Sequence, residues 1–212
     1  MICVSVARPT LRGCLAAVKG LEMAEIRLDR TGLSPEEIRL LFAAPVTLIA
    51  TCRPGTRTDA GRTAALLAAI DAGAAFVDIE SDAPAALRKT ILAAARKARC
   101  RVVVSHHDFD RTPPRDRLLR LVAACFDRGA DVAKICCRVR DARECARMLS
   151  LYGTRRNLIA LGLGELGVVT RVAALFLGAP WTYASLAPGE ETGEGQLDLR
   201  TLESVLKLIQ HG

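Results

Sequence analysis

One lysine of this sequence stands where a lysine can act as a nucleophile. Lys134 lies in the apolar segment 131–137, whereas the other four lysines lie in segments typical of helices or of the surface. Burial beside other cations lowers the pKa of an amine, and a neutral amine attacks ketones. Lys134 in a central strand therefore indicates Schiff-base chemistry. The alternative is a structural ion pair between Lys134 and an inward carboxylate such as Glu80.

A Schiff-base enzyme also needs a group that moves protons beside the iminium carbon, and histidine titrates in the right range. His106 and His107 are adjacent, so in a strand they face opposite sides. The apolar Val102 and Val104 share the parity of His106 and predict that this side packs outward. We therefore choose His107 as the acid and base, with Glu80, one strand away, as the carboxylate that orients its ring.

Charged residues also recur where other predicted strands end. In segment 25–29, strict alternation puts Glu25, Arg27 and Asp29 on one face and apolar residues on the other. Arg53 follows the next strand, and segment 78–80 ends the strand after that. Charges inside a barrel are costly unless they are paired or contact a substrate. Their convergence indicates a binding site, and a structural network of salt bridges is the alternative.

These residues lie at the ends of apolar segments that alternate with amphipathic stretches of helix length. Such alternation predicts a wholly parallel sheet. Eight strand–helix units favour a single α/β domain, a (β/α)8 TIM barrel over residues 1–212. In this fold the reactive groups collect at the carboxyl ends of the strands. An open nucleotide-binding sheet would need GxGxxG after the first strand, which segment 7–10 lacks. The expected strands are 2–7, 24–28, 46–52, 76–80, 101–107, 131–137, 158–163 and 181–186.

Two connecting segments carry further signals. Ser34, Pro35 and Glu37 supply an N-cap, a proline at the first helical position and a capping-box glutamate, and so predict a helix start. The segment 187–195, rich in glycine and glutamate, follows the last strand and is long enough for a mobile lid.

The composition argues against several classes of protein. Half of the 212 residues are apolar and 25% are charged, which is typical of a globular domain. The eight cysteines form no CxxC and only three histidines are present, so we expect reduced thiols and no metal site. No apolar run reaches membrane length and segment 1–6 does not resemble a signal peptide, so we expect a cytoplasmic protein. The net charge of +7 comes from scattered arginines, and we expect no nucleic-acid binding.

The segments that carry these residues resemble the class I 3-dehydroquinate dehydratases, the Schiff-base (β/α)8 enzymes of the shikimate pathway. The match keeps the order of the family across almost the whole chain, and its most specific part is the SxHDF run followed by an isolated strand lysine. The matching motifs are EIRLD at 25–29, TCR at 51–53, VDIE at 77–80, SHHDF at 105–109, AKI at 133–135, TR at 170–171 and GQ at 195–196.

The resemblance implies a carbon–oxygen lyase that dehydrates 3-dehydroquinate to 3-dehydroshikimate, without a metal or an organic cofactor. It implies that Lys134 condenses with the C3 ketone of the substrate. His107 then removes the C2 proton and protonates the departing C1 hydroxyl, and Glu80 orients this histidine. The resemblance assigns the substrate carboxylate to Arg171, assisted by Gln196 and Thr192 from the lid. It assigns the ring hydroxyls to Glu25, Arg27 and Arg53.

This chain departs from the family in the lid and in the seventh strand. Residues 192–196 read Thr-Gly-Glu-Gly-Gln, where the family has a small hydroxyl residue followed by Ala-Pro-Gly-Gln. We expect the missing proline to loosen the lid and Glu194 to place an anion near a carboxylate site. Leu161 and Leu163 replace methionines that are common in the family, which nearly conserves volume.

Two other functions stay open from the sequence. A class I aldolase on the same barrel would also use a lysine on the sixth strand, although Glu165, after Gly162 and Gly164, would repel a phosphate. A barrel without catalysis would bind an anionic metabolite or nucleic acid through the arginine excess, with a steep salt dependence for nucleic acid. The sequence leaves open a biosynthetic or a catabolic role and the number of subunits, a homodimer being one option.

Overall fold

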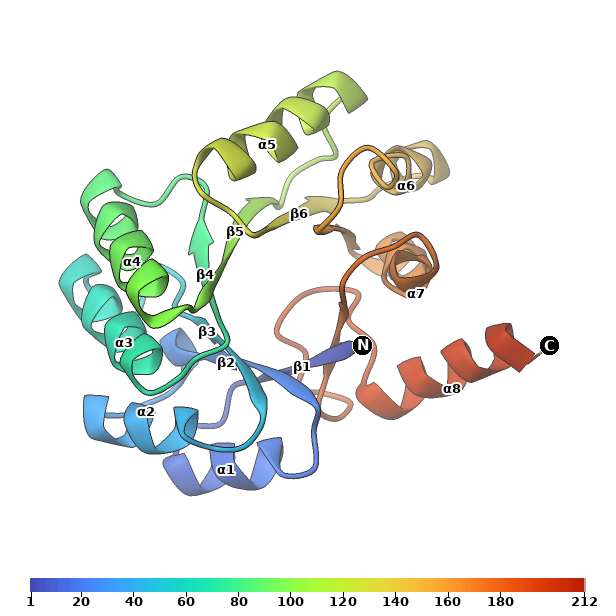
Figure 1. Ribbon diagram of the computed structural model, residues 1–212. Helices are drawn as coiled ribbons and strands as arrows, with labels where there is room; N and C mark the ends of the chain where they lie inside the picture. Colours follow the sequence, from blue (N-terminus) through green and yellow to red (C-terminus); the bar gives the residue numbers. More distant parts are fainter. Residues whose placement is uncertain (212) are drawn as a thin grey trace.

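Eight parallel strands form a ring that is surrounded by helices in the computed structural model, which describes residues 1–211 (Figure 1). The strands are β1 (Ile2–Val6), β2 (Met23–Arg27), β3 (Thr47–Thr51), β4 (Phe76–Glu80), β5 (Arg101–Asp108), β6 (Val132–Arg138), β7 (Leu158–Leu163) and β8 (Thr182–Ser185). The helices are α1 (Leu11–Val18), α2 (Pro35–Phe42), α3 (Asp59–Asp71), α4 (Ala85–Ala98), α5 (Arg115–Asp127), α6 (Ala142–Leu149), α7 (Val168–Phe176) and α8 (Leu199–His211), with short 3-10 turns at Leu28–Arg30 and Glu165–Gly167.

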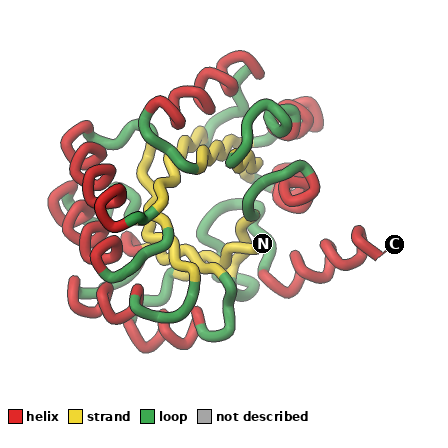
Figure 2. The backbone as a smooth tube through the Cα atoms, in the orientation of Figure 1, coloured by secondary structure: helices red, strands yellow, loops and turns green. Residues whose placement is uncertain are grey.

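The predicted (β/α)8 architecture is confirmed. Every expected strand is present and its bounds agree to within one residue at either end. The strands pair in the order β7-β6-β5-β4-β3-β2-β1-β8, all in parallel. Within residues 1–211, no ladder joins β7 to β8, so the ring is nearly closed and has one seam (Figure 2).

Alternation along each strand separates two apolar cores. The outward residues, such as Ile26, Val104 and Ile135, pack against the helices. Inward residues near the amino ends of the strands fill the bore, where Phe76 and Trp181 meet edge to face with ring centroids 4.9 Å apart. We call this inner cluster the barrel floor; it includes Met23, Ile49, Phe76, Val103, Val132, Ile159 and Trp181. The inward residues further along β2 to β5 are polar, whereas those of β7 are Leu161 and Leu163. The floor lies beneath this polar layer.

The helix start at Ser34 is also confirmed. The Ser34 hydroxyl accepts from the backbone of Glu37, the Glu37 carboxylate accepts from the backbone of Ser34, and Pro35 is the first helical residue of α2. Helix α8 projects outward from the ring (Figure 1) and packs on it through Leu202 and Leu206. In the described part of the chain, we find no helix whose length and hydropathy would let it span a membrane.

Candidate active site

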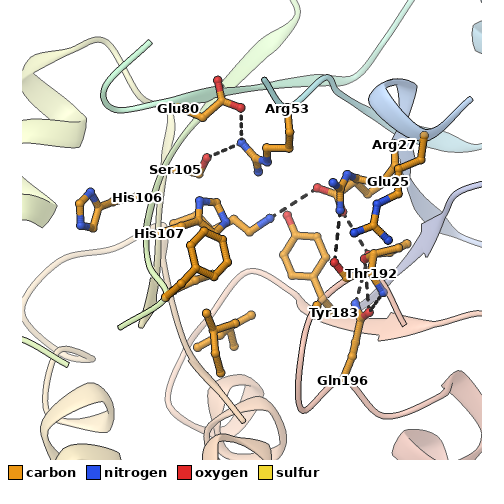
Figure 3. Close-up of a pocket in the computed structure, with 18 of the residues that line it drawn as sticks. Glu25, Arg27, Arg53, Glu80, Ser105, His106, His107, Tyr183, Thr192 and Gln196 are labelled. Carbon is orange, nitrogen blue, oxygen red and sulfur yellow. Dashed lines mark hydrogen bonds and ion pairs between the residues drawn. The ribbon is translucent and has the colours of Figure 1, made fainter. Parts of the chain in front are cut away.

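A cavity of about 400 Å³ opens at the carboxyl ends of the strands, a volume suited to a small ligand. Figure 3 shows its polar side chains pointing inward from several strands and from the loop after β8. The structure brings all nine predicted site residues to the wall of this one cavity: Glu25, Arg27, Arg53, Glu80, His107, Lys134, Arg171, Thr192 and Gln196.

Lys134 is buried on the inward face of β6, between two carboxylates. Its Nζ lies 3.5 Å from Glu25 Oε1 and 3.4 Å from Asp78 Oδ2. Burial lowers the pKa of Lys134, but Glu25 and Asp78 outweigh this effect, so the pKa is raised. The expectation of a neutral amine among cations is therefore wrong for the unliganded site. Lys134 is an ammonium ion held between two anions.

Asp78 is a site residue to which the sequence analysis assigned no role. Its carboxylate accepts two hydrogen bonds from Arg53, at 2.9 and 2.8 Å, and one from Ser105 at 2.6 Å. Burial raises the pKa of Asp78, but the combined effect of Arg53 and Lys134 is larger and lowers the pKa overall, so the carboxylate stays ionised. The sequence could have predicted this position, because Asp78 and Glu80 are two residues apart on β4 and therefore face the same inward side.

Glu25 is ionised for similar reasons. It accepts from Ser5 Oγ at 3.1 Å and from Thr51 Oγ1 at 2.9 Å, in addition to Lys134. Burial raises the pKa of Glu25, but Lys134 and Arg27 reverse the effect and the pKa is lowered. Arg27 itself pairs with Asp29 at 2.7 Å, because the chain turns into a 3-10 helix after β2 and brings the two side chains together.

Glu80 does not contact His107 as we expected from the sequence. One of its oxygens accepts from Arg53 at 2.8 Å and the other from Arg62, a buried residue of α3 that reaches over the end of β3. Arg62 also donates to the carbonyl of Cys52 at 2.9 Å. Both oxygens of the Glu80 carboxylate are therefore paired with arginines. The expectation that Glu80 orients the His107 ring by direct contact is wrong.

His107 points into the cavity, whereas His106 reaches only its rim and points to the other side of β5, beside Ser81 (Figure 3). The choice of His107 as the inward histidine is confirmed by this placement. Burial, together with the charges of Arg53 and Lys134, lowers the pKa of His107 well below its ordinary value. A neutral imidazole beside an ammonium ion is ready to accept a proton. The ring stacks on Phe109, with centroids 5.9 Å apart.

Arg171 is a buried cation that no carboxylate of the described chain pairs with. It lies on α7 with 3% of its surface exposed, and its Nε has no hydrogen-bond partner among residues 1–211. Burial lowers the pKa of Arg171. An unpaired guanidinium on the wall of a cavity is suited to bind an anion, above all a carboxylate, in a two-pronged contact.

The start of α7 is packed tightly against β7, and this places Arg171. A Cβ added at Gly167 would lie 2.4 Å from the carbonyl carbon of Gly162, so neither position tolerates a side chain without movement. Thr170 fixes the same contact, because its hydroxyl accepts from the Gly162 backbone at 2.7 Å and donates to the Gly167 carbonyl at 2.6 Å. Arg171 follows directly and enters the cavity.

The β8–α8 loop (residues 186–198) covers the cavity. Gln196 donates to Ser5 at 3.2 Å and accepts from the Thr192 backbone at 2.9 Å. Arg27 donates to the Thr192 carbonyl at 3.3 Å, and Arg171 donates to the Glu194 carbonyl at 3.0 Å. Side chains from β2 and α7 therefore hold the loop against the mouth of the barrel.

Glu194 points away from the position that we expected. Its carboxylate forms an ion pair with Arg138 at the end of β6, on the outer side of the loop. Its carbonyl, rather than its charge, faces Arg171. The extra anion of this loop is thus paired outside the cavity and leaves the guanidinium of Arg171 free of a carboxylate.

The whole sequence is similar to that of known proteins. Residues 2–212 match a family model described as type I 3-dehydroquinase. The chain is 33% identical over 211 residues to the 3-dehydroquinate dehydratase of Syntrophobacter fumaroxidans, covering 91% of this chain and 88% of that protein. It is 30% identical over 219 residues to the enzyme of the same name from Desulfotalea psychrophila, covering 96% of each.

Solved structures extend the likeness to the fold. The 3-dehydroquinate dehydratase from Geobacillus kaustophilus superimposes with a TM-score of 0.87 at 21% identity, covering 99% of this chain and 90% of that one. At this identity, the superposition shows a shared barrel.

Proposed function

Because the chain belongs to the type I 3-dehydroquinase family, a family of lyases, we propose that it removes water from 3-dehydroquinate through a Schiff base on Lys134. The product is 3-dehydroshikimate. The observation that carries the proposal is the placement of an ammonium ion, a neutral imidazole and an unpaired guanidinium around one cavity, from Lys134, His107 and Arg171.

Arg171 binds the carboxylate of the substrate. The buried guanidinium has no other anion to satisfy it, and the β8–α8 loop closes over it. With the carboxylate fixed at Arg171, the ring of the substrate lies toward Lys134. Thr192 and Gln196 line the cavity from the loop and assist Arg171 at the carboxylate. Glu25, Arg27 and Arg53, which line the same cavity, bind the ring hydroxyls.

The positive charge of Lys134 in the free site is compatible with the charge balance of the first step, which is formation of the Schiff base. An ammonium ion and a ketone give an iminium ion and water, so one positive charge is present on the nitrogen before and after condensation. The neutral amine is needed only for the attack itself. Glu25 and Asp78, which favour the ammonium ion, favour the iminium ion for the same electrostatic reason. Arg53 keeps Asp78 in place for this role.

His107 moves the proton in the second step. The iminium withdraws electrons from the C3–C2 bond and acidifies the C2 proton, which the neutral imidazole removes. The electron pair forms the enamine and neutralises the nitrogen. The imidazolium then donates its proton to the C1 hydroxyl, which leaves as water while the iminium forms again. Hydrolysis of that iminium releases the product and restores Lys134. In this scheme Glu80 acts on the site through Arg53, with which it is paired.

Trapping with borohydride tests the proposal. The protein is incubated with 3-dehydroquinate and sodium borohydride, and the modified peptide is identified by mass spectrometry. We expect the adduct on Lys134, no adduct and no turnover in Lys134→Ala, and a trapped but unreactive complex in His107→Ala. Lys89→Ala, at an exposed lysine of α4, is the matched control and keeps full activity. Turnover of the unchanged protein without trapping, or normal turnover in either site variant, refutes the mechanism.

The two alternative functions lack comparable support. An aldolase of phosphosugars needs an open phosphate site after β7, where this chain has Glu165 and where Gly195 of the β8–α8 loop contacts the backbone of Gly164. A barrel that only binds an anion has no use for the neutral base His107 beside Lys134. We also propose a cytoplasmic location and no nucleic-acid partner; the eight free thiols support the former.

A further inference from the structure

Tyr183 is a residue of the site that neither the proposed mechanism nor the family resemblance uses. It lies on the inward face of β8, 2% exposed, between the barrel floor and the cavity (Figure 3). Lys134 Nζ is 4.0 Å from the centroid of its ring. The Tyr183 hydroxyl is buried and has no hydrogen-bond partner among residues 1–211, so hydrogen bonding by this group does not explain the placement of the ring.

The ring is one of several groups that lie around the reactive nitrogen, in addition to His107. Glu25 from β2 and Asp78 from β4 are its anionic partners, Arg53 lies behind Asp78, and Cys136 is the next inward residue of β6. Tyr183 presents the face of its ring to the nitrogen from β8. An aromatic face attracts a cation by its quadrupole, and the attraction is strong where water is excluded.

This attraction matters most after the nitrogen has become an iminium. An ammonium ion has three N–H donors and can satisfy Glu25 and Asp78 together. A protonated Schiff base has a single N–H, so one of the two carboxylates loses its hydrogen bond when the Schiff base forms. Attraction to the ring depends on charge and needs no N–H donor, so it persists through condensation and ends only when the enamine neutralises the nitrogen.

We propose that the ring of Tyr183 is a positioning residue that holds the Lys134 nitrogen in place and stabilises its iminium form. The inference rests on the proposed Schiff-base function and adds a specific residue to it. The ring, and not the hydroxyl, carries the role. The ring attracts the ammonium ion as well, but the iminium has lost one carboxylate hydrogen bond and depends more on the ring. Loss of the ring therefore lowers the amount of iminium at equilibrium, by up to about thirtyfold at the upper end of cation–π energies.

Three variants separate the ring from the hydroxyl and from packing. Tyr183→Phe keeps the ring, whereas Tyr183→Leu and Tyr183→Met remove it with aliphatic side chains of two shapes. We expect Tyr183→Phe to match the unchanged protein within about twofold, because the hydroxyl is unpaired. We expect Tyr183→Leu and Tyr183→Met to lower kcat and the yield of borohydride adduct at Lys134 by up to about thirtyfold, and by more than Tyr183→Phe does. KM changes little, since Arg171 and the loop still bind the substrate. Thermal unfolding of each variant shows that the compared proteins are folded.

The outcomes distinguish this inference from the function on which it rests. If the unchanged protein turns over without any adduct at Lys134, the Schiff-base function fails and the inference fails with it. If the unchanged protein is trapped at Lys134 and the Leu and Met variants are trapped and turn over equally well, only the role of the ring is refuted. A Phe variant as impaired as the Leu variant also refutes it, because the ring is then insufficient.

Discussion

Gly195 controls how closely the β8–α8 loop approaches the barrel. Its φ of +71° lies in the left-handed region, and a Cβ at this position would lie 2.3 Å from the carbonyl oxygen of Gly164. Real Cβ atoms essentially never approach another heavy atom closer than 3.0 Å, so Gly195→Ala forces the loop to move outward by about 0.7 Å or to change its turn. Gln196, the next residue, moves with it.

The backbone conformation alone sets a lower limit for the effect. A left-handed conformation costs an L-residue about 1 to 2 kcal/mol, and the collision with a backbone carbonyl adds to this because no side chain can swing aside. We therefore expect the closed loop to be disfavoured by at least about five- to thirtyfold. Since the closed loop places Gln196 and Thr192 over the cavity, KM for 3-dehydroquinate should rise by a similar factor.

Gly189→Ala is the matched control, because it separates strain from collision. Gly189 lies in the same loop with a φ of +84°, and an added Cβ meets nothing within 4 Å. The assay is steady-state turnover of 3-dehydroquinate for both variants, together with thermal unfolding. Both variants carry the left-handed strain and only Gly195→Ala adds the collision, so we expect KM to rise further in Gly195→Ala than in Gly189→Ala, with similar melting temperatures. Equal KM values in the two variants would refute the reasoning from close approach.

Three further predictions use the charged network and the thiols. Arg62→Met removes one of the two arginine partners of buried Glu80 and leaves one carboxylate oxygen without its donor, so it should lower the free energy of unfolding in urea by about 1 to 3 kcal/mol; a loss that fits an exposed pair would contradict the burial of this contact. The folded pKa of His107 is far below the ordinary 6.5, so its protonation favours unfolding, and stability should fall as pH drops below about 6.5. His107→Gln should flatten that part of the stability profile. Seven of the eight cysteines are buried, so a thiol reagent should modify Cys145 rapidly in the native protein and all eight after denaturation; fast reaction at several sites would be the contrary result.

The strands and their inward faces could be predicted from the sequence because each depends on neighbouring residues. Parity alone predicted that His107 points into the cavity and His106 to the other side of β5, and the cap at Ser34 is complete within four residues. Such signals need no knowledge of how distant segments meet.

The charge of Lys134 could not be predicted in the same way. Its two carboxylate partners, Glu25 and Asp78, are 109 and 56 positions away, and the register of the whole ring decides whether they reach it. The partner of Glu80 was missed for a related reason. Arg62 belongs to α3 and has the pattern of an ordinary helical residue, and only the packing of that helix over β3 turns it inward.

The barrel floor restricts how a ligand enters and leaves the cavity. Phe76, Trp181 and their neighbours fill the bore beneath the reacting groups, so the cavity opens on the side of the β8–α8 loop. The reactant must enter and the product must leave through this same opening. A product molecule that lingers there excludes the next reactant, and the rate at which the loop opens sets a ceiling on turnover however fast the bonds are broken.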